Sequence, residues 1–381
     1  MEPPLLPIEP VAVLHQALRP PLIGGVAKPK KPGGYRDSSA DIAFGLAERG
    51  IRVVTPVERP NPDHDDDWSF PDTAAGIDQA VTLGARTLWA NTVLYSTHPL
   101  AEVRLRLVAQ RPADVERYDD KVTTNGLLER RGCPVPKSLV VEGAGVSDGD
   151  WVERLRRALH AREMEFPLVA KPIRGRGSEG VSKVESLAEL RSAVETLCAA
   201  RSRHDGVEIP RYGDAVLVEE FLPGRELTVT VMPPGSYSIA GSEVVRDSHW
   251  ALGPVERFSH RDGIAPYSGV VAVAANSRLL DAEELADESV RRNQRHCESA
   301  ARAIDARAPI RIDCREDRDG AIKLFDLNMK PNMTGAGRPG RDDQNGLSSI
   351  AAHTVGWNYR DLLVNMLRQA WTAEPTPQDR R

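Results

Sequence analysis

Residues 170–184 read AKPIRGRGSEGVSKV, and Gly175, Gly177 and Gly180 in it follow the G-x-G-x-x-G spacing of phosphate-binding loops. In a dinucleotide-binding protein, a loop of this spacing leads from a strand into a helix. Here the residues after Gly180 alternate between apolar and polar, which is typical of a strand. The sequence therefore predicts a glycine hairpin between two strands, either a flap over nucleotide phosphates or a plain exposed turn.

A lysine on the first strand of this hairpin favours the flap. Lys171 precedes the glycines, whereas a Walker A loop carries its lysine directly after the last glycine. Backbone N–H groups of a glycine loop, here including that of Ser178, can donate to phosphate oxygens, and a neighbouring ammonium adds a point charge. The loop and Lys171 together predict a triphosphate site.

A second informative run is RIDCREDRDGAIKLFDLN, residues 311–328. It predicts a β-hairpin, because two alternating segments flank the turn signal DRDG. With residues 317–320 as the loop, Asp313 would pair with Leu324. A slip of one residue would exchange the two faces, so the grouping of the polar side chains depends on this register.

Four polar side chains share one face of the predicted hairpin: Arg311, Asp313, Asp326 and Asn328. Two carboxylates and an amide oxygen suit a hard cation such as Mg²⁺, which completes its coordination with phosphate oxygens and water. The run therefore predicts a magnesium site. The alternative is a solvated hairpin that carries turn-promoting acids.

The composition of the chain argues against several other classes of function. The chain has 381 residues and a formal net charge of −5, so it has no general attraction to nucleic acid or to an acidic membrane. It contains no run of about eighteen apolar residues that would span a bilayer. Its cysteines form no C-x-x-C pair and its histidines no H-x-x-x-H pair. We expect a cytoplasmic protein with small-molecule partners and neither nucleic acid nor membrane as a partner.

Alternating strand and helix patterns divide the chain into three parts, 1–115, 116–212 and 213–381. In the first we expect strands at 11–14, 51–57 and 85–90 and helices at 37–50, 73–83 and 99–110. In the second we expect the glycine hairpin, a strand at 138–142 and helices at 118–131, 151–162 and 186–200. In the third we expect strands at 215–222 and 226–232, an irregular segment 233–277, a helix 281–303, the hairpin and a final helix after residue 359.

Together these motifs resemble the ATP-grasp superfamily and, within it, the D-alanine–D-alanine ligase-like carboxylate-amine ligases. The resemblance covers residues 118–370 well and the amino-terminal part loosely. It implies an α/β (α+β) protein with an ATP-grasp fold and an N-terminal Rossmann-like pre-ATP-grasp domain. Lys121 of YDDK and Lys171 of VAKP match the family's two phosphate-binding lysines. The flap residues would be Gly175, Gly177, Ser178 and Gly180.

The segment VLVEEFLPGREL resembles the family's acidic, hydrophobic strand that holds adenine and ribose. The resemblance implies that Glu219 accepts from the adenine amino group, while Phe221 and Leu222 supply the hinge contact. Glu226 would accept from the ribose hydroxyls, since a carboxylate facing a diol is a good polar anchor in an apolar slot. The alternative is a surface carboxylate pair.

The resemblance also implies ATP and two Mg²⁺ ions, which Mn²⁺ could replace, with Asp313, Asp326 and Asn328 as metal ligands. The family usually has glutamate where this chain has Asp326. Lys171 and Arg311 would be catalytic: the γ-phosphoryl group passes to a carboxylate, an amine attacks the acylphosphate, and Arg311 stabilises the oxyanion. We expect an ADP-forming carbon–nitrogen ligase that joins a small-molecule carboxylate and an amine.

Five residues are candidates for substrate contacts. Arg338 and Arg341 lie in an insertion, where they would hold an acceptor carboxylate or belong to a mobile charged loop. His260 lies in the region of the family's lid and is either a proton acceptor for the amine or an exposed loop residue. Ser348 would contact substrate or cap the following helix. Gly25 belongs to our candidate for the family's Gly-Gly pair after the first strand.

The substrate loop departs from the family pattern, with Asn332 in place of glycine and the insertion behind it. This departure argues against D-alanine and favours a ligase of specialised metabolism that acts on amino acids or related metabolites. Two alternatives stay open: an ATP-grasp cyclo-ligase with intramolecular capture, and a non-catalytic nucleotide-binding protein. A non-catalytic nucleotide-binding protein has no physical need for both lysines, Arg311 and the oxygen ligands together. Related ligases are often dimers, so a homodimer is consistent with the resemblance.

Overall fold

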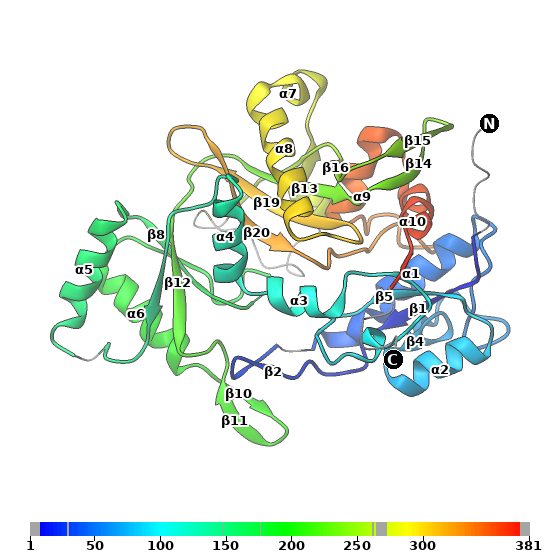
Figure 1. The fold of residues 1–381 in the computed structure, drawn as a ribbon, viewed down its shortest axis with the longest axis horizontal. Coiled ribbons are helices and arrows are strands. Elements are labelled where there is room, and N and C mark those ends of the chain that lie inside the picture. Colours follow the sequence, from blue (N-terminus) through cyan, green and yellow to red (C-terminus); the bar gives the residue numbers. More distant parts are fainter. Residues whose placement is uncertain are drawn as a thin grey trace, which may run out of the picture.

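The computed structural model describes residues 8–28, 30–146, 148–175, 177–260, 263 and 273–373. Its strands form three larger sheets, and helices pack against them (Figure 1). Three apolar clusters of buried residues fill the space between these layers. Within the described ranges, no helix combines the length and the apolar character needed to cross a bilayer.

The first sheet has the order β21-β6-β5-β1-β4. Four of its strands are parallel, and β21 is antiparallel to β6. The strands are β1 (Val11–His15), β4 (Phe70–Pro71), β5 (Thr87–Asn91), β6 (Arg106–Val108) and β21 (Trp371–Thr372). Helices α1 (Arg36–Ala47) and α2 (Ala74–Thr82) belong to the connections between them. This is a Rossmann-like arrangement, in which the carboxyl ends of the parallel strands form one common edge.

Two predictions for this region are wrong. Residues 99–110 form a short 3₁₀ turn, Pro99–Ala101, and the strand β6 in place of a helix. Leu107 and Val108 are buried where β6 pairs with β5, and this pairing outweighs local helix propensity. Residues 51–57 form no strand, because β4 lies beside the carboxyl end of β1 and leaves only a single bridge for Val53.

The second sheet has the order β7-β12-β8-β9. Its strands are β7 (Ser138–Glu142), β8 (Leu168–Pro172), β9 (Ser182–Val184) and β12 (Ala215–Glu220). Helices α5 (Trp151–Ala161) and α6 (Leu187–Ala199) pack on it over a shared apolar core. Because β8 and β9 are antiparallel neighbours, the predicted glycine hairpin is confirmed. A second hairpin, β10 (Arg201–His204) with β11 (Val207–Pro210), was not predicted.

The third sheet has the order β18-β17-β13-β19-β20, and β16 also pairs with β13. The strands are β13 (Glu226–Met232), β16 (Trp250–Ala251), β17 (Val255–Arg257), β18 (Ser277–Leu279), β19 (Ile310–Glu316) and β20 (Ile322–Asn328). Helices α8 (Glu288–Ala303) and α9 (Leu347–Ala352) both contact β13. Helix α10 (Tyr359–Arg368) contacts α1 and thereby joins this part to the first sheet.

The segment 233–277 is not irregular where the structure describes it. Besides β16 and β17 it contains a hairpin of β14 (Gly235–Ile239) and β15 (Ser242–Arg246). Its turn residues Ala240 and Gly241 have φ values of 50° and 77°, as a two-residue hairpin turn of type I′ requires. Tyr237 anchors the hairpin, since its ring is buried against two tryptophans. The segment lacks a long apolar alternation, which explains why the sequence did not indicate these strands.

Two predicted helices are divided in the structure. The helix expected at 118–131 begins at Lys121 as α4 (Lys121–Arg130), and α3 (Pro112–Tyr118) precedes it. The N-cap of α4 is Asp120, whose carboxylate accepts from the N–H of Thr123. The helix expected at 281–303 breaks at Asp287 into α7 (Ala282–Ala286) and α8. A short hairpin, β2 (Leu22–Ile23) with β3 (Val26–Ala27), extends from the first part toward β10 and β11 (Figure 1).

Candidate active site

The start of α4 joins the glycine loop to the hairpin of β19 and β20. The Lys121 ammonium donates to the carbonyl of Gly175 (3.4 Å) and lies 3.5 Å from Oδ1 of Asp326. Burial lowers the pKa of Lys121, but nearby carboxylates, Asp326 foremost, outweigh burial and hold it above the usual value. Lys121 is therefore charged and reaches both the predicted phosphate loop and the predicted metal face.

The glycine loop depends on backbone conformations that glycine adopts freely. Gly177, Ser178 and Gly180 have φ values of 63°, 59° and 73°. A Cβ on Gly180 would also lie 3.0 Å from side-chain atoms of Leu197 and Pro172. The turn is thus specified by both local conformation and packing.

Lys171 bridges the second and third sheets. It lies on β8 opposite Leu217, and its ammonium reaches diagonally to the carboxylate of Glu219 on β12 (2.6 Å). The ammonium also donates to the carbonyl of Phe325 on β20 (3.1 Å). Asn125 of α4 donates to the other oxygen of Glu219 (2.9 Å), and both Lys171 and Glu219 are buried. The predicted contact between Glu219 and adenine stays a prediction, since both carboxylate oxygens have protein partners here.

The predicted ribose carboxylate is surrounded by basic side chains. Glu226 is buried at the start of β13, with His260 Nε2 at 2.8 Å and guanidinium nitrogens of Arg315 and Arg257 at 3.8 and 3.9 Å. His260 therefore lies beside the predicted nucleotide end of the site, and the structure gives it a carboxylate partner. The alternative of an exposed loop histidine is wrong, while its role toward an amine stays a prediction.

The hinge residues lie between these two carboxylates. Phe221 and Leu222 directly follow β12. The Phe221 ring faces two cations, the Lys183 ammonium 4.7 Å and the Arg315 guanidinium carbon 5.5 Å from its centroid. Leu222 is buried. The segment thus forms an apolar link between Glu219 and the start of β13, where the resemblance expects the adenine.

The β19–β20 hairpin contains a β-bulge that the predicted register lacks. Cys314 pairs with Leu324, but Asp313 pairs with Asp326, so Phe325 is the extra residue. The predicted pairing of Asp313 with Leu324 is therefore wrong. Cys314 and Leu324 are buried in the core, and in a regular strand Asp326 would point to the same side as Leu324. The extra residue turns Asp326 to the side of Asp313.

The bulge brings the four predicted polar side chains to one face. Arg311 pairs with Asn328 beside the pair of Asp313 and Asp326, so the predicted grouping is confirmed although its register was wrong. Nε and Nη2 of Arg311 donate to the two oxygens of Asp313 (3.1 Å each), and the hydroxyl of Thr228 donates to it at 2.8 Å. Burial raises the pKa of Asp313, but the Arg311 charge outweighs burial and holds it below the usual range.

The donor set on this face fits a magnesium ion. Asp313 and Asp326 supply carboxylate oxygens and Asn328 an amide oxygen, which accepts from the N–H of Lys330 (2.9 Å). Arg311 and Lys121 provide positive charge to the same carboxylates. The metal-ligand roles of the three residues stay predictions.

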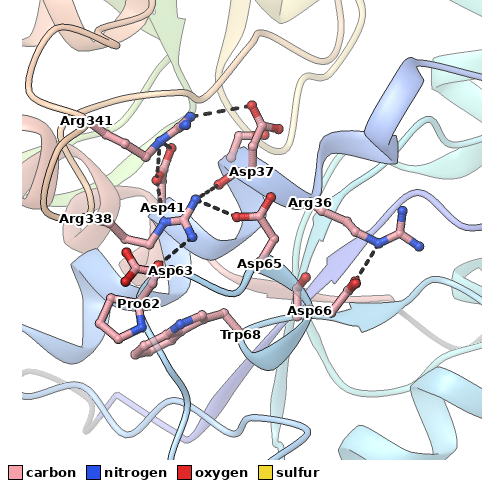
Figure 2. A network of polar contacts seen from close by, with 12 residues as sticks. Arg36, Asp37, Asp41, Pro62, Asp63, Asp65, Asp66, Trp68, Arg338 and Arg341 are labelled. Carbon is pink, nitrogen blue, oxygen red and sulfur yellow. Dashed lines mark hydrogen bonds and ion pairs between the residues drawn. The ribbon is translucent and has the colours of Figure 1, made fainter.

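The inserted loop is held on the N-terminal part by two arginines (Figure 2). Arg338 is buried; its Nε donates to Asp41 of α1 (2.9 Å), and its Nη2 lies 2.7 Å from Asp65. Nε of Arg341 donates to the second oxygen of Asp41 (2.8 Å), and its Nη2 lies 3.5 Å from Asp37. The interpretation of a mobile charged loop is therefore wrong. The donors of Arg338 that would clamp a substrate carboxylate are directed to protein acceptors.

Ser348, a further substrate candidate, lies at the start of α9. The N-cap of α9 is Gly346, which has no side chain to act as a cap, so the prediction that Ser348 caps this helix is wrong. Ser348 is the second residue of α9 and is buried, and its Oγ lies 3.0 Å from the hydroxyl of Thr230 on β13. This contact fixes α9 to the third sheet.

The glycine pair in front of α1 is Gly33–Gly34, not the pair that contains Gly25. Gly24 and Gly25 form the turn of the β2–β3 hairpin, with φ values of 60° and 77°. Gly34 accepts from the N–H of Gln16 (2.8 Å), and a Cβ on it would lie 2.2 Å from the Gln16 carbonyl oxygen. Only glycine allows this close approach at the end of β1.

Sequence reasoning missed three residues that shape the site: Asn125, Thr228 and Asp41. Asn125 and Thr228 orient Glu219 and Asp313 through hydrogen bonds, and their partners lie far along the chain. For Asp41 the sequence does contain a signal, because it is an acid among apolar residues in SSADIAFGLA. This pattern indicates a buried acid, and a buried acid requires a cationic partner.

Comparison with known proteins agrees with this geometry. The sequence profile described as "D-ala D-ala ligase C-terminus" matches residues 127–368. The D-alanine–D-alanine ligase of Mannheimia succiniciproducens is 27% identical over 248 residues, which cover 65% of this chain and 66% of that protein. The ligase of Psychrobacter sp. is 28% identical over 251 residues, which cover 66% of this chain and 61% of that protein. The matches thus span slightly less than two thirds of these relatives.

Solved structures of similar fold cover nearly the whole chain. The VanG D-Ala:D-Ser ligase from Enterococcus faecalis has a TM-score of 0.59 and 13% sequence identity, over 94% of this chain and 98% of that one. The D-alanine–D-alanine ligase from Bacillus anthracis complexed with ATP has a TM-score of 0.58 and 14% identity, over 95% of this chain and 96% of that one. The predicted ATP-grasp fold is therefore confirmed. The chain belongs to the family of proteins that contain the D-ala D-ala ligase C-terminal domain.

Proposed function

We propose that this protein is an ATP-dependent, ADP-forming ligase that joins a carboxylate and an amine into an amide through an acylphosphate. One observation carries the proposal. Arg311, Asp313, Asp326 and Asn328 lie on one strand face, and Lys121 connects this face to the glycine loop. Family membership supports the same activity.

In the proposed reaction the lysines and the metal face act on the phosphates of ATP. Bound at Asp313, Asp326 and Asn328, magnesium would neutralise phosphate charge and orient the phosphoryl group. Lys121 and Lys171 place ammonium groups beside the loop and the strand β20. Glu219, Phe221, Leu222 and Glu226 would hold the nucleoside, which requires a nucleotide to replace some of the internal contacts of Glu219 and Glu226.

Arg311 would stabilise the charge that develops on the carboxylate substrate. Transfer of the γ-phosphoryl group forms a carbon–oxygen–phosphorus linkage and releases ADP. An amine then attacks the acyl carbon, phosphate leaves, and the amine gives up one proton. Asp313 fixes the Arg311 guanidinium by two hydrogen bonds, so the remaining N–H groups have a defined direction toward the oxyanion.

We infer that the substrates are amino acids or related metabolites and that the ligase serves specialised metabolism in the cytoplasm. Two departures from the family pattern, Asn332 in place of glycine and the inserted loop after it, support a substrate set other than D-alanine. The relatives named above are D-alanine–D-alanine ligases. Efficient synthesis of D-alanyl-D-alanine by this protein would contradict the inference.

The test is turnover of Mg-ATP by the purified protein with L- and D-amino acids, singly and in pairs, with ADP, AMP and phosphate separated. Pair-dependent formation of equal ADP and phosphate is the expected result. AMP with pyrophosphate would mean adenylation and overturn the mechanism. A product equal in mass to one acid minus water would indicate intramolecular capture. No turnover with any acid, in a protein that binds ATP, would indicate a binding role.

A further inference from the structure

A segment of the N-terminal part extends to the glycine loop of the second sheet. The N–H of Gln16, at the end of β1, donates to the carbonyl of Gly34 (2.8 Å), so the chain between them leaves the first sheet and returns to the same point. Residues 17–28 of this excursion contain the β2–β3 hairpin, and we call them the strap. The N–H groups of Ala17 and Leu18 both donate to Oδ1 of buried Asp72 (2.8 and 2.7 Å). The strap therefore starts from a fixed point on the first sheet.

The far end of the strap packs against the second part of the chain. Strand β3 contacts β11 (Figure 1), and a Cβ on Gly213 would lie 3.2 Å from Cγ2 of Val26. Ile23 and Val26 also line a cavity of about 30 Å³ together with Gly175 of the glycine loop. Since one water needs about 10–15 Å³ on this measure, the cavity holds about two or three waters and no larger ligand. The strap thus supports the glycine loop and leaves no space for a nucleotide between them.

The last residue of the strap, Lys28, forms an ion pair with Asp119, and both side chains are mostly buried. Asp119 directly precedes Asp120, the N-cap of α4. Arg174, the residue before Gly175, lies 3.9 Å from the other carboxylate oxygen of Asp119. A second nitrogen of Arg174 lies 3.3 Å from the carboxylate of Asp120. Asp119 is therefore a junction at which the strap, the glycine loop and the start of α4 meet.

Asp119 also acts on Lys121, the lysine that reaches the glycine loop. Burial raises the pKa of Asp119, but the charge of Lys28, ahead of that of Lys121, outweighs burial and holds it below the usual range. The Lys121 ammonium itself donates to the carbonyl of Gly175 (3.4 Å). If Lys28 were absent, Asp119 would lose its main partner, and its charge would draw the Lys121 ammonium away from the glycine loop.

We propose that Lys28 is a positioning residue for the nucleotide: by pairing with Asp119, it keeps this carboxylate from competing with the phosphates for Lys121. The inference rests on the proposed function, because a bound nucleotide is what gives Lys121 and the glycine loop their role. It extends that function to the N-terminal part of the chain, whose strap supplies Lys28. The strap thus prepares the phosphate end of the site before the ligand binds, as residues that support a binding site do.

The test measures binding of Mg-AMPPNP, a non-hydrolysable ATP analogue with three phosphoryl groups, to the full chain by isothermal titration calorimetry. Neither substrate needs to be known for this experiment. Lys28→Ala should raise the Kd about tenfold, the effect expected when one charge-assisted hydrogen bond to the ligand is lost. Lys28→Arg keeps the positive charge beside Asp119 and should stay within about twofold of the wild type.

Two further variants separate positioning from general support of the fold. Arg19→Ala is the matched control: it removes another cation of the strap, whose exposed partner Asp205 lies in the turn between β10 and β11, and it should leave the Kd unchanged. Asp119→Asn, added to Lys28→Ala, removes the carboxylate that would compete for Lys121. This double variant should bind within about threefold of the wild type, although it lacks the ion pair altogether. A purely structural role of Lys28 predicts no such recovery.

The outcomes distinguish this inference from the proposed function. Wild-type affinity in Lys28→Ala, or an equal loss of affinity in Arg19→Ala, would overturn the role of Lys28 and leave the ligase function intact. A double variant that binds no better than Lys28→Ala would also overturn it. If the wild-type protein does not bind Mg-AMPPNP at all, the proposed function fails first, and the inference fails with it.

Discussion

The β19–β20 hairpin and the loop that follows it, residues 329–346, use charged side chains in different ways. On the hairpin, the Asp326 side chain is 34% exposed and shares an accessible face with Lys121. In the loop, the Arg338 side chain is 5% exposed and pairs with fully buried Asp41. The comparison shows that charge in a loop beside an active site does not by itself indicate contact with substrate.

The two regions also differ in the sequence distance of their partners. Asp313 and Asp326 belong to one hairpin, so a turn signal and an alternating pattern predict that they meet. Arg338 and Asp41 are 297 residues apart, and no local pattern connects them. The pairing within the hairpin can be inferred from the periodicity of the sequence. The two loop arginines, in contrast, meet their partners only when α1 packs on the third part of the chain.

The largest expected effect is on the hairpin. Asp326→Asn should lower ADP formation about 10³-fold, equal to about 4 kcal/mol in the barrier, because one anionic ligand and the partner of Lys121 are lost. The melting temperature should change little. Asp326→Glu, which restores the residue usual in the family, is the matched control and should retain most activity. Full activity of Asp326→Asn would remove the metal role and break the comparison.

The next effect concerns the loop. Arg338→Ala should lower the free energy of unfolding by about 3–5 kcal/mol, since it leaves buried Asp41 with a single cationic partner. Denaturant titration measures the change. Asp342→Ala, at an exposed position of the same loop, is the control and should stay within about 0.5 kcal/mol of the wild type. A variant as stable as the wild type but unable to bind the amine would instead assign Arg338 to the substrate.

A third test extends the comparison to the first sheet, where His15 is buried at the end of β1. Burial, assisted by the charge of Arg36, lowers the pKa of His15 from 6.5 to about 4. Between these pH values the unfolded state binds more protons, so stability should fall as the pH falls, by about 3 kcal/mol in total. The His15→Asn variant should lack this part of the pH dependence. If the free energy of unfolding depended on pH in the same way for both proteins between pH 7 and 4, this prediction would be contradicted.

The smallest effect separates the two arginines of the loop. Arg341 is 25% exposed and shares Asp41 with Arg338, so Arg341→Ala should cost only about 1–2 kcal/mol. The double variant with Arg338→Ala should be less stable than the sum of the single effects, because it leaves Asp41 without either arginine. Strict additivity would show that the two arginines act independently.

Much of the fold and of the site was predictable from the sequence. The glycine hairpin, Lys121 at a helix start and the grouping of the four polar residues on the β19–β20 hairpin are confirmed. The register was not predictable, because the extra residue Phe325 is specified by the burial of Leu324 and by the contact of its carbonyl with Lys171. The strand β6 was mistaken for a helix, since its pairing with β5 is a tertiary effect.

The sequence by itself determined the family of folds, the glycine hairpin and the polar face of the β19–β20 hairpin, because these depend on patterns within one strand, turn or hairpin. Only the tertiary structure decided that Gly33–Gly34 approaches β1 and that Arg338 and Arg341 meet Asp41. Each of these depends on contacts between segments far apart in the chain. Such contacts arise when whole helices and strands pack together. The periodicity of residues along one segment carries no information about this packing.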